Sequence, residues 1–335
     1  MIAAPAVGDE PIWRVFLSAF HAPALVIADE LGLFAALAGG PRSASALADE
    51  LGVELRATET IAGVLAGLEL LITADGAFEL TDCARTYLLP GAPYYWGGFL
   101  RRMRENPLDY AKLAGALKRG KAAAEARVTG AWESKLPPPE ILVAFTHAMH
   151  AHSFALAMRV TPRLDLREKM LDVGGGSGSY SIAATIHDAT LRATVLDLPA
   201  VCAVTQEYAA RFGVGDRVST APANMFSDPW PLGHDRVLMS DIFHDWDDER
   251  CAWLAARART SLVRGGRVIL HEMILDDAKD GPLAAHAYSM AMIFHTQGRQ
   301  RSARELAALL ERAGFTDVAV APTAGGYAAI SGAAP

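Results

Sequence analysis

The sequence contains little cysteine. Only three of its 335 residues are cysteines, Cys83, Cys202 and Cys251, and they form no Cys-x-x-Cys pair. This excludes a disulfide framework and a cysteine-ligated zinc site, and it is typical of a protein kept in a reducing compartment. The N-terminal residues carry acids instead of a basic stretch, and no apolar run is long enough to span a membrane. We therefore expect a soluble, cytoplasmic protein without a secretory signal.

Positive charge is also scarce. The chain has 31 Lys and Arg residues against 38 Asp and Glu residues, a formal net charge of -7. A protein whose main partner is nucleic acid or an anionic membrane needs the opposite balance, so neither partner is expected. Hydrophobic residues, by contrast, make up 51% of the chain, which is enough for sizeable cores, and the length favours more than one domain.

Residues 1–105 are predicted to form an α-helical, winged-helix-like domain. Apolar spacing, capping residues and turn chemistry predict three helices and then a small hairpin with a turn at Asp75-Gly76, at residues 13–37, 43–52, 58–71 and 72–82. Arg56 is the only basic residue between Arg42 and Arg85, too few to neutralise DNA phosphates. The Ala-rich, apolar surface indicates instead that a second subunit covers this domain.

A helical connector, residues 106–160, precedes a region of alternating strands and helices, residues 161–335. The alternation predicts a Rossmann-like α/β sheet that is mostly parallel, with an antiparallel last strand. The expected strands are residues 169–176, 191–198, 217–223, 236–242, 265–275, 317–323 and 326–331.

The strongest local signal is the segment MLDVGGGSG, which ends at Gly178. A strand runs into glycines there, and glycines let the backbone turn sharply and approach a ligand closely. Asp197 closes the next strand, 19 residues after Gly178, a spacing that suits a carboxylate receiving two ribose hydroxyls. Because the pattern is D-x-G-G-G-x-G, with Asp172 inside the strand, it favours a methyl donor over a nicotinamide cofactor.

Five motifs together carry a resemblance to a known family: LDVGGGSG, VLDLP, FHDWDDE, LVRGGRVILHE and GRQRS followed by LLERAGF. Over nearly its whole length the chain resembles the S-adenosylmethionine-dependent small-molecule O-methyltransferases, the plant caffeate-type and bacterial enzymes. The resemblance implies a class I methyltransferase fold, a homodimer through the N-terminal domain, a small-molecule substrate and S-adenosylmethionine as cofactor. The residues that it places around the cofactor are Ser153, Asp172, Gly174, Gly176, Asp197, Leu198, Asn224, Met225 and Ser240.

The same resemblance assigns His244, in the His-Asp-Trp motif, as the general base, a role that suits imidazole because its usual pKa is about 6.5. In the plant enzymes two acids flank this histidine. The first matches Glu272, but the position of the second holds the neutral Gln300. Asp245 is a further candidate base. The second orienting carboxylate of the family is thus missing from its motif.

His295 stands where the plant enzymes generally have an apolar residue. Two imidazoles, His244 and His295, suit a borderline metal such as Fe or Zn, and the pair resembles the α-keto acid C-methyltransferase branch of the family. That branch methylates the β-carbon of a 2-oxo acid through a metal-stabilised enolate, in the biosynthesis of antibiotics that contain β-methyl amino acids. Arg127 is a candidate clamp for the substrate carboxylate, and the expected apolar pocket wall is Trp96, Phe145, Met149 and Phe243.

Two alternatives remain open. In the first, the enzyme is a metal-independent O-methyltransferase of a phenolic natural product, in which His244 acts alone as base and His295 is a core histidine. In the second, the chain is a non-catalytic, S-adenosylmethionine-binding regulator that uses its winged helix, although the acidic balance and the intact His-Asp-Trp motif argue against this.

Overall fold

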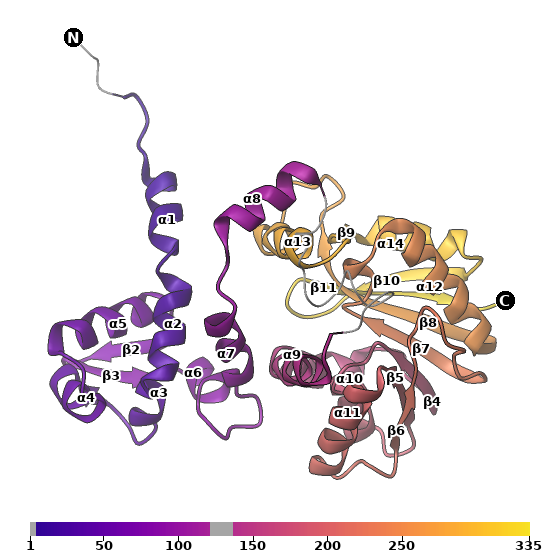
Figure 1. Ribbon diagram of the computed structural model, residues 1–335, viewed down its shortest axis with the longest axis horizontal. Coiled ribbons are helices and arrows are strands. Elements are labelled where there is room, and N and C mark those ends of the chain that lie inside the picture. The colour runs from indigo at the N-terminus through magenta and orange to yellow at the C-terminus, as the bar shows by residue number, and fades with distance from the viewer. Residues whose placement is uncertain (1–4, 121–136) are drawn as a thin grey trace. The chain divides into compact units, whose positions relative to one another are not determined.

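The computed structural model describes residues 5–120 and 137–335, and the chain divides into two compact units, residues 1–107 and 108–335 (Figure 1). The helices of the predicted connector belong to the second unit. There α8 (Tyr110–Arg119) contacts α13 (Leu283–His295), and α9 (Pro139–Val160) contacts α10 (Ser179–His187) and α11 (Pro199–Arg211).

The first unit has the predicted order of helices followed by a hairpin. Its elements are α1 (Glu10–Ser18), α2 (His21–Glu30), α3 (Leu33–Ala36), β1 (Arg42–Ser43), α4 (Ala44–Leu51), α5 (Leu55–Gly67), β2 (Leu71–Ala74), β3 (Ala77–Leu80), α6 (Asp82–Tyr87) and α7 (Gly97–Glu105). The hairpin turn lies at Asp75 and Gly76, whose φ angles of 50° and 75° match a two-residue hairpin loop. The strands pair antiparallel in the order β1-β3-β2.

Two helix predictions in this unit were wrong in their bounds. The single helix expected over residues 13–37 is three helices, and α3 begins after Gly32, which has the left-handed φ of 79°. The helix expected over residues 58–71 is α5, which ends at Gly67 because Glu69 has a φ of 59° and turns the chain into β2.

The outer surface of α1 is strongly apolar. None of the residues of this helix is buried in the described chain. Its large apolar side chains, and those of the adjoining residues, are exposed instead: Ile12, Trp13, Val15, Phe16, Leu17 and Phe20. The core of the unit lies elsewhere, around Phe34, Leu47 and Leu65. An exposed apolar helix of this kind marks an interaction surface.

The second unit alternates strands and helices, as expected. After α8, α9 and η1 (Thr161–Arg163) come β4 (Lys169–Val173), α10, β5 (Arg192–Asp197), α11, β6 (Val218–Pro222), β7 (His234–Ser240), η2 (Phe243–Asp245), α12 (Asp248–Ser261), β8 (Leu262–Leu275), α13, β9 (Arg301–Ser302), α14 (Ala303–Arg312), β10 (Thr316–Pro322) and β11 (Tyr327–Ala333).

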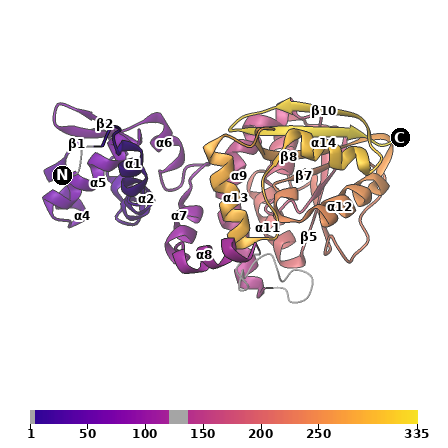
Figure 2. The ribbon, with the colours of Figure 1, turned by 90° about the horizontal axis from the view of Figure 1, so that it is seen from above.

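Its sheet has the order β10-β11-β8-β7-β4-β5-β6. From β8 to β6 every neighbouring pair is parallel, whereas β11 is antiparallel to both β8 and β10, which confirms the predicted antiparallel last strand. The central strands β4 and β7 are mostly buried, whereas the edge strand β10 is mostly exposed, and the helices of the second unit surround the sheet (Figure 2). Leu171 and Val237 face a core with α12 and α14, while their neighbours Met170 and Leu238 face one with α9 and α10.

Two segments, Glu10–Glu30 and Pro139–Arg163, are long and apolar enough to cross a membrane by length and composition, so the prediction that no apolar run reaches this length was wrong. The core helix of a soluble protein has the same property. In the second segment Ala157 and Val160 pack in a core of the second unit, and 39% of its apolar window is buried.

Candidate active site

The turn between β4 and α10 is built on glycine. Gly174, Gly176 and Gly178 have φ angles of 67°, 58° and 74°, which residues with a Cβ rarely adopt. A Cβ on Gly174 would lie 2.5 Å from Ile242 Cδ1, whereas a Cβ on Gly176 would meet no atom within 4 Å. The turn at Gly176 therefore borders open space, and a ligand has room to approach its backbone.

Asp197 lies beside this turn, at the end of β5. Its Oδ2 accepts a hydrogen bond from Gly176 N at 2.9 Å, and its Oδ1 accepts one from Leu198 N at 2.7 Å. Burial raises the pKa of the carboxyl to about 6. The end of β6 lies alongside, because Ala223 N donates to Asp197 O at 2.9 Å. The residues thus meet at the carboxyl edge of parallel strands, where doubly wound sheets bind their ligands.

His244 lies in η2, the turn that follows β7, and this turn is held by the Gly-Arg-Gln-Arg-Ser segment. Arg301 donates to the carbonyls of Phe243 and Trp246 at 2.7 and 2.8 Å. A Cβ on Gly298 would lie 2.0 Å from His244 O, so only glycine allows the two backbones to approach this closely. The two motifs, far apart in the sequence, form one packed site.

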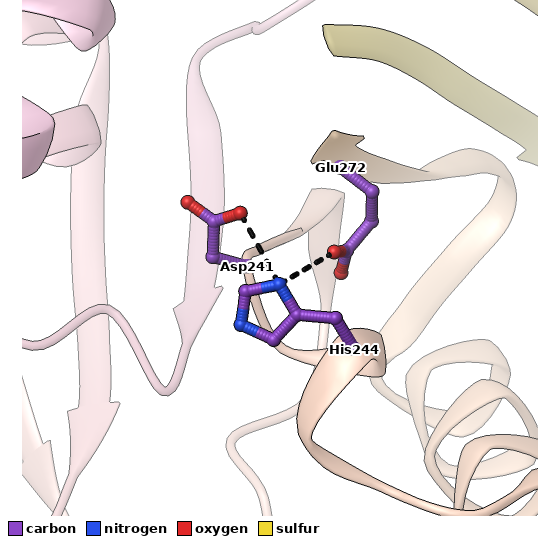
Figure 3. Close-up of side chains that lie close together, drawn as sticks. All are labelled: Asp241, His244 and Glu272. Carbon is purple, nitrogen blue, oxygen red and sulfur yellow. Dashed lines mark ion pairs between the residues drawn. The ribbon is translucent and has the colours of Figure 1, made fainter. Parts of the chain in front are cut away.

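Three side chains surround the Nδ1 atom of His244, and two of them, Asp241 and Glu272, are drawn in Figure 3. Glu272 Oε2 lies 3.4 Å away, Asp241 Oδ1 3.5 Å away and Gln300 Nε2 3.2 Å away. The other ring nitrogen, Nε2, lies 3.6 Å from Asp245 Oδ1. Nδ1 therefore has three polar neighbours and Nε2 has one.

Burial dominates the electrostatics of this site. It lowers the pKa of His244 to about 3, so the imidazole is neutral at physiological pH. It raises the pKa of Asp241 to about 7 and that of Asp245 to about 8, the latter also through repulsion from Asp241. Burial and the charge of Asp241 together raise the pKa of Glu272 well above its usual value. Such clustered, shifted groups are typical of catalytic sites.

Comparison with known proteins assigns the chain to a family. Residues 110–316 match the model of the O-methyltransferase domain, and residues 13–90 match the O-methyltransferase dimerisation domain. A 3-hydroxy-5-methyl-1-naphthoate 3-O-methyltransferase of Streptomyces sahachiroi is 35% identical over 88% of this chain and 86% of its own length. The chain belongs to the O-methyltransferase family. It is an S-adenosylmethionine-dependent methyltransferase with the class I fold.

Other relatives of this methyltransferase agree with that assignment. The mitomycin biosynthesis 6-O-methyltransferase of Streptomyces lavendulae is 26% identical over 93% of the chain and 90% of its own length. The structure of human N-acetylserotonin methyltransferase in complex with S-adenosylmethionine superposes with a TM-score of 0.83, at 25% identity and 99% coverage of both chains.

The remaining predicted cofactor residues of the methyltransferase have the following surroundings. Asn224 Oδ1 accepts from Phe226 N at 3.0 Å, and Met225 follows it at the end of β6. Ser153 Oγ lies 3.2 Å from the ring of the preceding histidine on α9. Ser240 Oγ lies 3.3 Å from His271 Nδ1.

Asp172 lies underneath the glycine turn instead of lining its open side. Its side chain is buried and accepts from Ser181 Oγ at 2.7 Å. A Cβ on Gly175 would lie 2.6 Å from the Asp172 carboxyl carbon, so the acid packs directly against the turn. We conclude that Asp172 supports the turn in the described structure.

The metal pair His244 and His295 of the methyltransferase stays a prediction. Among the described residues, the group whose ligand atoms lie within 4.8 Å of one another is Asp241, His244 and Glu272. His295 lies at the last position of α13, with its ring centroid 4.7 Å from that of Phe294, and it is not part of this group.

The residues predicted to form the apolar wall of the pocket belong to both units: Trp96 to the first, and Phe145, Met149 and Phe243 to the second. Phe243 was predicted wrongly, because its side chain is fully buried in the core between the sheet and α12. Trp96 packs against the core of the first unit. Phe145 and Met149 are half-buried and lie one turn apart on α9. Arg127 lies outside the described residues.

Sequence reasoning missed two side chains next to the proposed base. Tyr288, on α13, packs edge-on against His244 with ring centroids 5.3 Å apart. Asp241 directly follows β7, and its position at the carboxyl end of a strand was a signal that could have identified it.

We predict that Asp197→Ala lowers the affinity for S-adenosylmethionine at least about tenfold, because hydrogen bonds to a charged group contribute about 1.5–3 kcal/mol. Calorimetric titration of the purified variant measures this directly. Asp216→Ala, at an exposed acid of the same unit, is the control and should leave the affinity unchanged. Equal affinities in both variants would place the ribose site elsewhere.

Proposed function

We propose that the enzyme is a metal-independent O-methyltransferase that transfers the methyl group of S-adenosylmethionine to a hydroxyl on an aromatic ring. The observation that carries the proposal is His244, a buried and neutral imidazole with its polar neighbours on Nδ1. This arrangement leaves Nε2 to accept the hydroxyl proton. The names of the relatives support it, since the naphthoate and mitomycin enzymes are both named for methylation at oxygen.

In the proposed reaction, S-adenosylmethionine supplies a methyl group on a positively charged sulfur, which makes the methyl carbon an electrophile. His244 Nε2 takes the proton from the substrate hydroxyl. The substrate oxygen then forms its bond to the methyl carbon as the carbon–sulfur bond breaks. The imidazolium that results lies 3.5 Å from the Asp241 carboxyl and 3.4 Å from the Glu272 carboxyl, and a negative charge on one of these two acids stabilises it.

The glycine turn and Asp197 fit the cofactor that this reaction requires. The open side of Gly176 admits a ligand against the backbone, and the Asp197 carboxylate has lone pairs beyond those used by its two amide partners. A cofactor with ribose hydroxyls and a positive sulfur also favours the charged form of this buried acid. Ser153 is proposed to hold the carboxylate of the donor, and Asn224 and Met225 are proposed to frame its adenine.

The names of the relatives and the contacts of Arg301 support this function over C-methylation of a 2-oxo acid. The naphthoate and mitomycin enzymes are named for methylation at oxygen. Arg301, the cation next to the His-Asp-Trp turn, is already held by Asp248 at 2.7 Å and by two backbone carbonyls, so its hydrogen bonds are used within the protein and not for a substrate carboxylate.

We also propose that the enzyme is a homodimer through its first unit. Residues 13–90 match a dimerisation domain. The exposed apolar side chains of α1 lie within or beside that range, and a second copy of the chain would remove them from water.

The two methylation chemistries are separated by assaying the purified enzyme with 3-hydroxy-1-naphthoate and with phenylpyruvate, with and without EDTA. We expect a methyl ether from the naphthoate, identified by the chemical shift of its methyl group, at a rate that EDTA does not change. A product methylated at carbon, with loss of activity on chelation, would replace this proposal by the metal-dependent one.

His295→Ala tests the same question in the protein. In the proposed enzyme this change removes a half-buried side chain from the end of α13, so kcat should fall less than about tenfold, and chelation should have no further effect. His286→Ala, at another half-buried histidine of α13, is the matched control. Loss of bound metal and of turnover together in the His295 variant alone would restore the metal pair.

A further inference from the structure

Asp241, three residues before His244 of the His-Asp-Trp motif, has an unusual backbone conformation. Its φ is 53°, in the left-handed region that few residues other than glycine, asparagine and aspartate adopt. Two neighbouring strands hold it there. Its N–H donates to His271 O of β8 at 3.0 Å, and its Oδ2 accepts from Tyr327 of β11 at 3.4 Å. The backbone strain is therefore maintained by specific contacts that aim this carboxyl.

The second oxygen of this carboxyl is aimed at His244. Asp241 Oδ1 is buried, makes no hydrogen bond in the described chain and lies 3.5 Å from His244 Nδ1 (Figure 3). Glu272 Oε2 is also buried without a hydrogen bond in the described chain, and it lies 3.4 Å from His244 Nδ1. Buried carboxylate oxygens without a partner are costly, so a donor is expected between them. A proton on His244 Nδ1 would supply that donor to either acid.

Glu272 and Asp241 are not equivalent in this pair. Glu272 Oε1 already accepts from the N–H groups of Ile242 and Phe243 at 3.0 and 2.8 Å, so this acid anchors the turn. Two buried carboxyls whose oxygens lie within 4.8 Å do not both ionise readily. The Asp241 side chain is 17% exposed and that of Glu272 only 2%, so the charge is less costly on Asp241.

Gln300 cannot set the protonation of the ring. Its amide lies 3.2 Å from Nδ1 and can either donate or accept, and its Oε1 is buried without a partner. If the amide donates to Nδ1, the ring proton is on Nε2 and the base is lost. A carboxylate can only accept, so it selects the tautomer with the proton on Nδ1.

We infer that Asp241 is the residue that orients the general base: its Oδ1 holds His244 as the Nδ1–H tautomer, in place of the acid absent at Gln300, and Tyr327 holds Asp241. The inference rests on the proposed function for the role of the base. Asp241 acts through His244 and not on the substrate, so it is a positioning residue.

The first test is Asp241→Asn. Asparagine has the same shape and tolerates a positive φ, so the fold should be kept. We expect kcat to fall about 10- to 100-fold, with both KM values within about twofold, because only the tautomer population changes. Asp317→Asn is the matched control, since Asp317 also has a positive φ, of 46°, but is exposed on β10. A kcat within about twofold of the wild type in both variants would overturn the inference.

The second test is rescue by the double variant Asp241→Asn with Gln300→Glu. An acid at residue 300 supplies a new acceptor for Nδ1, so the double variant should recover kcat to within about fivefold of the wild type. A merely structural role of Asp241 predicts no recovery. In that case the losses of kcat caused by the two substitutions would add, or the protein would become less stable, and the positioning role would be wrong.

The third test needs no substrate. In protein labelled with 15N at histidine, the ring nitrogen shifts of His244, assigned by the signals missing from His244→Gln, report the tautomer. The wild type should show the proton on Nδ1, and Asp241→Asn should shift the population towards Nε2–H. If this occurs but no aromatic hydroxyl is methylated, the proposed function fails while the inference stands. If the methyl ether forms but the tautomer is the same in both proteins, the inference fails alone.

Discussion

His244→Gln is expected to lower kcat by about 100- to 10,000-fold, which is the range that general-base catalysis contributes. Glutamine is neutral and similar in size to histidine, but its amide does not take a proton at physiological pH. Binding of S-adenosylmethionine should be unchanged, because His244 lies in η2 after β7, whereas the glycine turn and Asp197 lie after β4 and β5. Single-turnover kinetics and calorimetry separate the two effects.

His234→Gln is the matched control for this experiment. His234 is also a buried histidine, but it lies at the first residue of β7, at the opposite end of the strand from η2. Its variant should keep nearly full activity if it folds. Retention of more than about a tenth of wild-type kcat by the His244 variant would mean that the protein supplies no general base at this position.

The double variant Phe16→Glu with Phe20→Glu is expected to convert the proposed dimer to monomers of 35.7 kDa. Both rings are 57% exposed in the single chain. In a two-fold symmetric interface each substitution occurs twice, so four charges would be buried without partners. Because burying an unpaired charge is so costly, we expect the dissociation constant to rise more than about a thousandfold.

Sedimentation of the double variant over a range of concentrations measures this change. Leu232→Glu with Val320→Glu is the control, because it adds the same charge at exposed apolar residues of the second unit. It should leave the mass unchanged. If the Phe16 and Phe20 variant sediments as the wild type does, α1 is not the interface, and its apolar surface has another partner.

Much of the fold could be predicted because its signals are local. The hairpin follows from Asp75-Gly76, whose residues accept the positive φ angles of a tight turn. The buried strands follow from apolar runs that end at glycine or acid, and the turn after β4 follows from three glycines that all need φ > 0. Helix ends were less predictable. No local feature of residues 58–71 shows that Glu69 turns the backbone there, because the pairing of β2 with β3 requires it.

In the candidate active site, the directions of the side chains could not be predicted from the local sequence. The sequence by itself determined the family, and it identified His244 as the candidate base and Glu272 as an acid next to it, because motif spacing places them at strand ends. Only the tertiary structure showed that Phe243, next to His244, faces the core, and that Asp241 faces the ring from three residues away. Side-chain direction in a turn depends on contacts with distant strands, here β8 and β11. Such contacts exist only in the folded chain, and periodicity does not encode them.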